Sequence, residues 1–303
     1  MSLIVILGPT AVGKTKLAVQ LALQLDAEII SADSRQVYRN MDLGTGKDIK
    51  EYNVGGFVVP HHLIDIKDAG TSYNVFDFQQ DFYKAYEAII GKGKTVILCG
   101  GTGLYLEAAL AKDQMIEVPV NESLRVELAP LNQEELVERL QRISSTLHNN
   151  TDLVDRDRTI RAIEIGEFKK RSTKVAKSPV QKSIVIGLKI DREKIRTRIA
   201  DRLQARLNDG MIEEVQSLLK QGVSYGQLNY YGLEYRFLSN YVEGKMNHEE
   251  MFDGLVQAIR RFAKKQMTWY RRMEKKGQKM NWINAEEQMD VKVQQALKLI
   301  NNK

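Results

Sequence analysis

Short, mostly apolar runs alternate with amphipathic helical patterns over the first hundred residues. Runs of strand length occupy residues 3–7, 28–32 and 95–99. Between them, apolar side chains recur at helical spacing over residues 14–25 and 76–90. Strands that alternate with helices in this way predict a parallel sheet flanked by helices on both faces. We therefore predict an α/β fold.

The pattern changes after residue 111. Residues 112–182 are richer in charged and polar helical stretches, and another apolar strand is predicted over residues 183–190. We expect residues 1–111 to form the first part of the α/β core. Residues 112–182 are expected to form an inserted helical subdomain, and residues 183–303 to complete the core and end in basic helices.

A glycine-rich loop follows the first predicted strand and gives the most specific motif. It reads Gly8, Pro9, Thr10, Ala11, Val12, Gly13, Lys14 and Thr15. Its glycines let backbone N–H groups turn toward a polyphosphate, Lys14 supplies a positive charge, and Thr15 offers a hydroxyl to Mg²⁺. The 8–15 loop therefore predicts a site for a diphosphate or a triphosphate, with Mg²⁺ as cofactor.

Two further candidates stand where predicted strands end. Asp33 follows the second strand, where a carboxylate can accept a proton or hold a Mg²⁺-bound water, although it also suits a turn or a helix cap. The 95–99 strand ends in Gly-Gly-Thr, where an ATPase normally places an acidic residue. This argues against a motor-type ATPase and leaves Asp33 as the leading base. Because ligands bind at the carboxyl ends of parallel strands, the 8–15 loop, Asp33 and residues 100–103, which include Thr102, are expected to share one crevice.

The positive charge is concentrated in two regions. The chain has 45 Lys and Arg against 39 Asp and Glu, a net charge of +6. On a helix over residues 256–272, six basic residues and no acidic residue lie within one arc of about 140°. The opposite arc is apolar and includes Phe262. The six are Arg260, Arg261, Lys264, Lys265, Arg271 and Arg272. A second cluster comprises Arg156, Arg158, Arg161, Lys169, Lys170 and Arg171. A solvated helix face is the usual explanation, but the missing acids suit nucleic-acid phosphates.

Other features limit the class of protein. No apolar run approaches the roughly 18 residues of a membrane span, and Met1 and Ser2 lead directly into the first strand. We expect a cytoplasmic protein without a membrane partner. The single cysteine, Cys99, lies in an apolar run and is expected to be a buried structural thiol. With no heptad seam in the sequence, we expect a monomer.

Several motifs, in order along nearly the whole chain, resemble the tRNA dimethylallyltransferases, also called isopentenyl-diphosphate:tRNA transferases. They are the 8–15 loop, Asp-Ser-x-Gln-x-Tyr at 33–38, Met-Asp-x-Gly-Thr at 41–45, Pro-His-His-Leu-Ile-Asp-Ile at 60–66, Gly-Gly-Thr-Gly-Leu-Tyr at 100–105 and a basic segment at 263–271. The resemblance implies a P-loop kinase-like fold. It also implies transfer of a dimethylallyl group from dimethylallyl diphosphate to N6 of the adenine immediately 3′ of the anticodon in tRNA, with release of diphosphate.

The resemblance also implies roles for particular residues. Asp33 is the base and Thr102 helps to hold the adenine, which must be extruded from the anticodon loop. The donor is bound by Gly8, Thr10, Ala11, Val12, Gly13, Lys14, Thr15 and Arg161, with Thr15 on Mg²⁺. Residues implied to contact tRNA are Asp33, Ser34, Arg35, Gln36, Thr102, Arg125, Asp157, Arg158 and Arg161.

The chain departs from the family pattern at three places. Asp157 stands where the family has glutamine, and Glu234 introduces a carboxylate where a small residue is expected. The segment before Asp155 also looks shortened. These departures leave the 8–15 loop, Asp33 and Thr102 unchanged.

Two other functions are compatible with the motifs taken separately. A small-molecule or nucleotide kinase could use the 8–15 loop for ATP, because a loop that binds a diphosphate also binds a triphosphate. A non-catalytic RNA-binding protein could retain the loop without using it. Release of ADP would indicate the kinase, and salt-dependent tRNA binding without diphosphate release would indicate the RNA-binding protein.

Overall fold

The computed structural model describes residues 2–143, 153–171 and 175–302. The chain divides into two compact units, one of Met1–Lys112 with Pro179–Lys303 and one of Asp113–Ser178. We call them unit 1 and unit 2. The sequence prediction placed the insertion at residues 112–182. The segment before Asp155 that looks shortened in the sequence lies largely outside the described residues.

Unit 1 is built on a six-stranded parallel sheet with the order β5-β2-β6-β1-β7-β8. Its strands are β1 (Leu3–Leu7), β2 (Ala27–Ser31), β5 (His61–His62), β6 (Thr95–Gly100), β7 (Ser183–Lys189) and β8 (Met280–Asn284). The predicted α/β class is confirmed. Strand β8 was not predicted, since the sequence indicated only charged helices after residue 190. Apolar and polar residues alternate too weakly over these five positions to predict a strand, and Ile283 is the one buried side chain among them.

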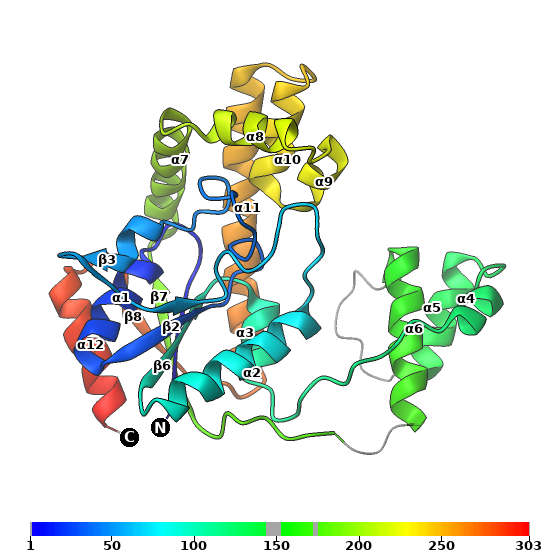
Figure 1. Ribbon diagram of the computed structural model, residues 1–303, viewed down its shortest axis with the longest axis horizontal. Helices are drawn as coiled ribbons and strands as arrows, with labels where there is room; N and C mark the ends of the chain where they lie inside the picture. Colours follow the sequence, from blue (N-terminus) through cyan, green and yellow to red (C-terminus); the bar gives the residue numbers. More distant parts are fainter. Residues whose placement is uncertain (1, 144–152, 172–174, 303) are drawn as a thin grey trace. The chain divides into compact units, whose positions relative to one another are not determined.

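Alternate side chains of β1 enter two different apolar layers, because successive residues of a strand point to opposite faces of a sheet. Leu3, Val5 and Leu7 pack in the layer formed with α2 (Val75–Gly91), α3 (Gly103–Ala109) and α11 (His248–Lys275). Ile4 and Ile6 pack in the layer with α1 (Lys14–Leu25) and α12 (Met289–Asn301). The helices of the two layers cover opposite faces of the sheet (Figure 1).

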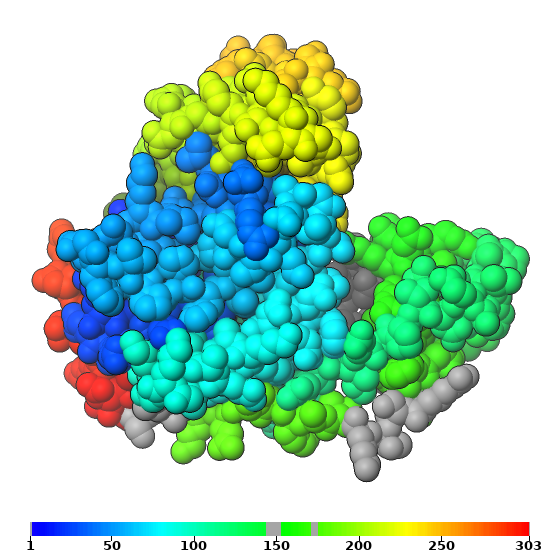
Figure 2. Space-filling model, viewed as in Figure 1, coloured from blue at the N-terminus to red at the C-terminus, as the bar shows by residue number. Residues whose placement is uncertain are grey.

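The remaining helices of unit 1 lie within the long loop that follows β2 or contact it. They are η1 (Ile49–Tyr52), α7 (Arg192–Asn208), α8 (Met211–Lys220), α9 (Tyr225–Tyr230) and α10 (Leu233–Val242), and a hairpin is formed by β3 (Asn53–Val54) and β4 (Phe57–Val58). The Glu214 carboxylate accepts hydrogen bonds from the backbone N–H groups of Asp42, Leu43 and Gly44, at 2.7–3.0 Å. Figure 2 shows the blue surface of these early residues meeting the yellow-green surface of α8–α10.

Unit 2 contains α4 (Glu122–Leu128), α5 (Gln133–Ile143) and α6 (Arg156–Arg171). Its small core is made of leucines from α4 and α5 and one isoleucine from α6: Leu124, Leu128, Leu136, Leu140 and Ile163. The helical character predicted for the insertion is therefore present in the described part of unit 2. Across the described ranges of both units, no helix is long and apolar enough to cross a membrane.

Candidate active site

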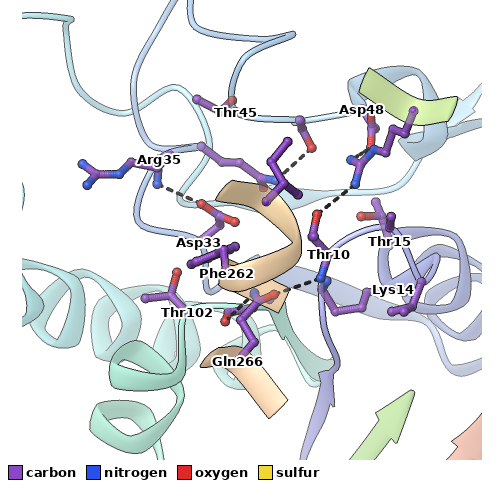
Figure 3. A pocket seen from close by; sticks show the side chains of 18 of the residues that line it. Thr10, Lys14, Thr15, Asp33, Arg35, Thr45, Asp48, Thr102, Phe262 and Gln266 are labelled. Carbon is purple, nitrogen blue, oxygen red and sulfur yellow. Dashed lines mark hydrogen bonds and ion pairs between the residues drawn. The ribbon is translucent and has the colours of Figure 1, made fainter. Parts of the chain in front are cut away.

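A cavity of about 970 Å³ in unit 1 lies where β1, β2 and β6 end. It is lined by Thr10, Ala11, Val12, Gly13, Lys14, Thr15, Asp33, Ser34, Arg35, Gln36 and Thr102. Gly8, also predicted to bind the donor, is not among the residues that line the cavity. It packs against β7, where an added Cβ would lie 2.8 Å from the Leu188 carbonyl oxygen. The strand ends thus bring together residues that are up to 92 positions apart, from Thr10 to Thr102 (Figure 3).

The 8–15 loop joins β1 to α1 in a conformation that exposes backbone N–H groups. Ala11 and Gly13 have left-handed backbone angles, with φ of 62° and 82°. Gly13 is the N-cap residue of α1, and Gly13, Lys14 and Thr15 line the cavity, so the first N–H groups of this helix, which have no partner within the helix, lie at the cavity wall. Such a loop before a helix N-terminus provides hydrogen-bond donors and partial positive charge for an anion.

Lys14 gives this loop a positive charge that depends on its surroundings. Its Nζ donates a hydrogen bond to the Pro9 carbonyl oxygen at 2.9 Å, which holds the side chain across the loop. Burial lowers the pKa of Lys14 to about 8, and the nearby Arg202 acts in the same direction. An anion bound beside Lys14 would favour its protonated form.

Asp33 and Thr102 lie close together because β2 and β6 are neighbours. The Thr102 hydroxyl accepts a hydrogen bond from the Ser34 N–H at 3.2 Å, and the Thr102 N–H donates to the Ala32 carbonyl oxygen. One Asp33 carboxylate oxygen accepts from the Arg35 N–H at 2.9 Å. The residues after Asp33 form turns, so its turn interpretation is correct and its helix-cap interpretation is wrong. The carboxylate also lines the cavity, and the turn fixes its position there.

The residues after Asp33 shape the same side of the cavity. The Arg35 guanidinium lies 5.2 Å from the centroid of the Tyr230 ring. The Gln36 side chain donates to the Gly46 carbonyl oxygen and accepts from the Ser31 hydroxyl. Glu234 lines the cavity as well, and burial raises its pKa. The departure noted in the sequence therefore places a carboxyl group within the candidate site.

Helix α11 connects the 8–15 loop to the end of β6. The Gln266 side chain accepts from the Thr10 N–H and donates to the Gly101 carbonyl oxygen, each at 2.9 Å. The Tyr270 hydroxyl lies 3.1 Å from the carbonyl oxygens of Gly8 and Gly101. These buried contacts fix the two loops relative to each other. Sequence reasoning gave Gln266 no role, because its partners are 165 and 256 positions away.

A second connection to the 8–15 loop comes from α7. Arg202 donates to the Thr10 hydroxyl at 3.3 Å and to an Asp48 carboxylate oxygen at 2.6 Å. Arg206 donates to the other oxygen of Asp48 at 3.1 Å. All three side chains line the cavity, and the sequence analysis found none of them. The arginine spacing of four positions on a charged helix was the available signal, since it places both guanidiniums on one face.

The basic face of α11 is partly balanced by an acid from another helix. Arg272 pairs with Glu107 of α3 at 2.9 Å, and its guanidinium lies 4.0 Å from the centroid of the Trp269 ring. Phe262, which the sequence placed on the apolar arc, has a 42% exposed side chain and lines the cavity. The helical wheel could not show that α11 passes beside an open cavity.

The remaining predicted residues lie in unit 2, where two of them contact one buried carboxylate. Arg125 and Arg161 each donate to Glu164 at 2.8 Å, and Arg161 also donates to the Val118 carbonyl oxygen. Asp157 and Arg158 are exposed in the first turn of α6. The proposed tRNA and diphosphate contacts of these four residues stay predictions. The side chain of Arg171, from the second basic cluster, lies outside the described residues.

The residues of the cavity fit a Mg²⁺ ion that is bound together with a phosphate ligand. Within residues 2–143, 153–171 and 175–302, no group of three or more His, Cys, Asp or Glu side chains could hold a metal ion by itself. Mg²⁺ is commonly bound by one or two protein oxygens, with substrate phosphate oxygens and waters completing the shell. The Thr15 hydroxyl, beside Lys14 in the cavity wall, fits that arrangement.

Cys99 is buried at the end of β6, as its apolar run predicted. Burial raises the pKa of its thiol to about 12. The thiol is therefore protonated at neutral pH and is unsuited to act as a nucleophile.

Comparisons with known proteins agree with the geometry. A family model described as IPP transferase matches residues 36–273. A protein of Bacteroides fragilis named tRNA dimethylallyltransferase 2 is 52% identical over 298 residues, which cover 96% of this chain and 95% of the relative. A protein of the same name from Porphyromonas gingivalis is 50% identical, with 98% of each chain covered.

Solved structures give the same result. The tRNA isopentenylpyrophosphate transferase from Bacillus halodurans has a TM-score of 0.73 at 32% identity, covering 99% of this chain and 96% of its own. A eukaryotic dimethylallyltransferase acting on tRNA has a TM-score of 0.81 at 22% identity, with 100% of this chain and 79% of the other covered, and supports the fold. The comparisons give no support to the kinase alternative. The chain therefore belongs to the IPP transferase family.

Proposed function

We propose that the protein transfers a dimethylallyl group from dimethylallyl diphosphate to N6 of the adenine immediately 3′ of the anticodon in tRNA. The observation that carries this proposal is the shared cavity, in which a loop suited to a diphosphate faces Asp33 and Thr102. Membership of the IPP transferase family and the names of the relatives support the same reaction.

The 8–15 loop would hold the diphosphate of the donor. Its backbone N–H groups and Lys14 offset the negative charge that grows on the diphosphate as the bond from oxygen to the prenyl carbon breaks. Arg202 of unit 1, which donates a hydrogen bond to the Thr10 hydroxyl of the loop, would add a further positive charge. Mg²⁺ held in part by Thr15 would supply further charge neutralisation.

Asp33 would accept the proton of the attacking amine. In the reaction, the adenine nitrogen forms a bond to the prenyl carbon, diphosphate leaves, and one proton of the amine passes to the Asp33 carboxylate. The Arg35 N–H and the turn after β2 hold this carboxylate in place. Thr102, 3.2 Å from the Ser34 nitrogen at the same strand ends, would help to position the extruded base.

The reaction is tested with purified protein, unmodified tRNA and dimethylallyl diphosphate. We expect one dimethylallyl group on the target adenosine by nucleoside mass spectrometry, and no release of ADP when ATP replaces the prenyl donor. An unmodified nucleoside would contradict the proposed reaction. Because tRNA is the proposed substrate, we also propose that the protein works in the cytoplasm. We propose that it is a monomer, because the sequence has no heptad seam.

The role of Asp33 is tested by Asp33→Asn, which keeps an oxygen for the Arg35 N–H. The variant should bind tRNA normally but lose about 10²- to 10⁴-fold in kcat, the range typical of a removed general base. Asp68→Asn, at a 77% exposed side chain paired with Arg39, is the matched control and should keep full turnover. Full turnover by Asp33→Asn would show that another group accepts the proton.

A further inference from the structure

Unit 1 contains a second cavity, of about 450 Å³, which we call the α7–α11 cavity. It is lined by residues of α7 and α11, by Ile190 after β7 and by Pro9 of the 8–15 loop. These residues are different from those that line the candidate active site. A volume of this size is typical of sites for small molecules.

The charged side chains around the α7–α11 cavity are all basic. Two come from the first two turns of α7 and four from α11, and none of the lining residues in the described part of the chain is acidic. The six are Arg192, Arg196, Arg260, Arg261, Lys264 and Arg271. Cations gathered around one concave surface create a positive potential that attracts an anion.

Most of these cations have no acidic partner. Within the described ranges, Arg196 is the one member of the set in an ion pair, with Glu193 at 3.3 Å, and both side chains are exposed, so solvent weakens this pair. Arg260 donates to the Arg196 carbonyl oxygen at 3.3 Å. Its Nε is buried and has no hydrogen-bond partner among the described residues. The cavity therefore offers positive charge and an unused donor.

The remaining wall of the cavity is mostly apolar. It is formed by Ile190, Ile195, Ile199, Ala263 and Met267. Ile199 and Ala263 are buried, and the other three are partly exposed. A bare phosphate group would use the cations and leave this wall in contact with water. A molecule with an apolar body and an anionic group would use both.

The α7–α11 cavity adjoins the diphosphate loop. Pro9 lines it, and the Pro9 carbonyl oxygen accepts the hydrogen bond from Lys14. The same two helices carry Arg202 and Gln266, which bond Thr10 of the loop. A ligand in this cavity would therefore touch the elements that hold the loop without occupying the candidate active site.

We propose that the α7–α11 cavity is a second ligand site, which binds a small soluble molecule with an apolar body and a phosphate-type anionic group. The six cations bind the anionic group, and the isoleucines and Met267 cover the apolar body. The proposal goes beyond the proposed function and does not depend on it, because it concerns a different cavity.

The probe is octyl phosphate, which is compared with inorganic phosphate by calorimetry at about 150 mM salt, where long-range attraction is screened. Both are titrated into the full-length Lys14→Met variant, because loss of the Lys14 charge weakens anion binding at the 8–15 loop. Octyl phosphate should bind at least about tenfold more tightly than inorganic phosphate, since each buried methylene group strengthens binding about fourfold.

A matched pair of charge reversals assigns the binding to the cavity. Lys264→Glu changes an exposed residue that lines it, and Lys275→Glu makes the same change at an exposed residue at the end of α11. In the Lys14→Met protein, Lys264→Glu should lower the affinity for octyl phosphate about tenfold, and Lys275→Glu less than about twofold. Thermal melting verifies that each variant is folded.

Crystals of the wild type grown with octyl phosphate give an independent readout. The alkyl chain should lie against Ile195 and Met267, with the phosphate group among the arginines. Octyl phosphate found only in the candidate active site would overturn the inference. Equal effects of Lys264→Glu and Lys275→Glu, or equal affinities for the two phosphates, would do the same.

Two further results would assign the cations to a macromolecular surface and also overturn the inference. One is displacement of octyl phosphate by an RNA anticodon stem-loop, which would indicate an RNA surface. The other is binding to phosphatidylglycerol vesicles that Lys264→Glu abolishes, which would indicate a membrane surface. None of these results concerns pyrophosphate binding at the 8–15 loop, so the proposed function is judged separately.

Discussion

Lys14 shows how burial tunes a single residue of the candidate site. Its pKa of about 8 lies close to neutral pH, so a fraction of the free protein carries an uncharged Lys14 at mildly alkaline pH. A bound diphosphate stabilises the charged form and should raise this pKa. Donor binding is therefore linked to the uptake of a proton in this pH range.

We expect the affinity for pyrophosphate to fall as pH rises from about 7 to 9, because Lys14 loses its proton over this interval. Calorimetry in buffers of different ionisation enthalpy should reveal proton uptake on binding. Lys14→Arg stays protonated over the whole range, and its affinity should change much less with pH. An equally steep pH dependence in Lys14→Arg would assign it to another group.

The end of β6 approaches the chain after β2 closely at Gly100. A Cβ at this position would lie 2.3 Å from the Ala32 carbonyl oxygen, so Gly100→Ala must push the strand ends apart. We expect it to lower the free energy of unfolding by about 1–3 kcal/mol. Gly91→Ala, in α2 with nothing within 4 Å, should instead stabilise by up to about 1 kcal/mol. Urea denaturation of both variants checks this difference in sign.

Sequence reasoning was most successful for residues next to each other in the chain. The 8–15 loop was recognisable because its spacing and its flanking elements are local. Asp33 and Thr102 were recognisable because each lies just after the end of a predicted strand. Arg202 and Gln266 lie 192 and 256 positions from Thr10, and only tertiary packing brings them to the loop. The spacing of Arg202 and Arg206 places both on one helix face, but nothing in the local sequence shows that this face or Gln266 meets the 8–15 loop.

At the level of elements, α11 acts as the support of the site. This 28-residue helix begins with a capping box at Asn247 and places Gln266 and Tyr270 one turn apart on its buried face. Sequence periodicity predicted the helix and its basic face. It could not predict that two polar side chains of the buried face bond the loops after β1 and β6.

Tyr270→Phe should weaken this support without changing the shape of the core. It leaves the carbonyl oxygens of Gly8 and Gly101 without the Tyr270 donor, at a cost of about 1–3 kcal/mol in the free energy of unfolding. Urea denaturation measures this loss. Tyr225→Phe, at a partly exposed position of α9, should change stability by less than about 0.5 kcal/mol. Equal effects of the two variants would mean that the Tyr270 hydroxyl has no special role.

For the whole molecule, the sequence predicted the fold class and the family, and both are confirmed. The family was recognisable because several motifs occur in order, and the fold because buried parallel strands read as apolar runs. Strand β8 was missed, since an edge strand is apolar on fewer positions. The ion pair between Arg125 of α4 and Glu164 of α6 was missed because a helical wheel does not show contacts between helices.

Unit 2 should respond to acid through Glu164. Burial alone would raise the pKa of this carboxyl, but hydrogen bonds from Arg125 and Arg161 outweigh burial and lower the pKa to about 2. A carboxyl with a lowered pKa in the folded state stabilises it fully above its unfolded pKa of about 4.5, and this contribution disappears as pH falls toward 2. Protection of α6 amides from hydrogen exchange should therefore decline over this interval.

Glu164→Gln removes the charge and keeps the size of the side chain. We expect lower protection of α6 at pH 7, by about 1–3 kcal/mol, and a weaker decline with acid than in the wild type. Glu138→Gln, whose 66% exposed side chain pairs with Arg142, is the control and should match the wild type. An unchanged acid response in Glu164→Gln would point to a different carboxyl.

The side-chain amide of Gln266 has one further consequence, for the substitutions that this position can accept. The amide oxygen accepts a hydrogen bond from the Thr10 N–H, and the amide nitrogen donates one to the Gly101 carbonyl oxygen. Glutamate has the same shape but only acceptor oxygens when ionised, so it would set negative charge against a carbonyl oxygen. Natural variation should therefore avoid the single-nucleotide change from glutamine to glutamate here, even though it is among the mildest in size.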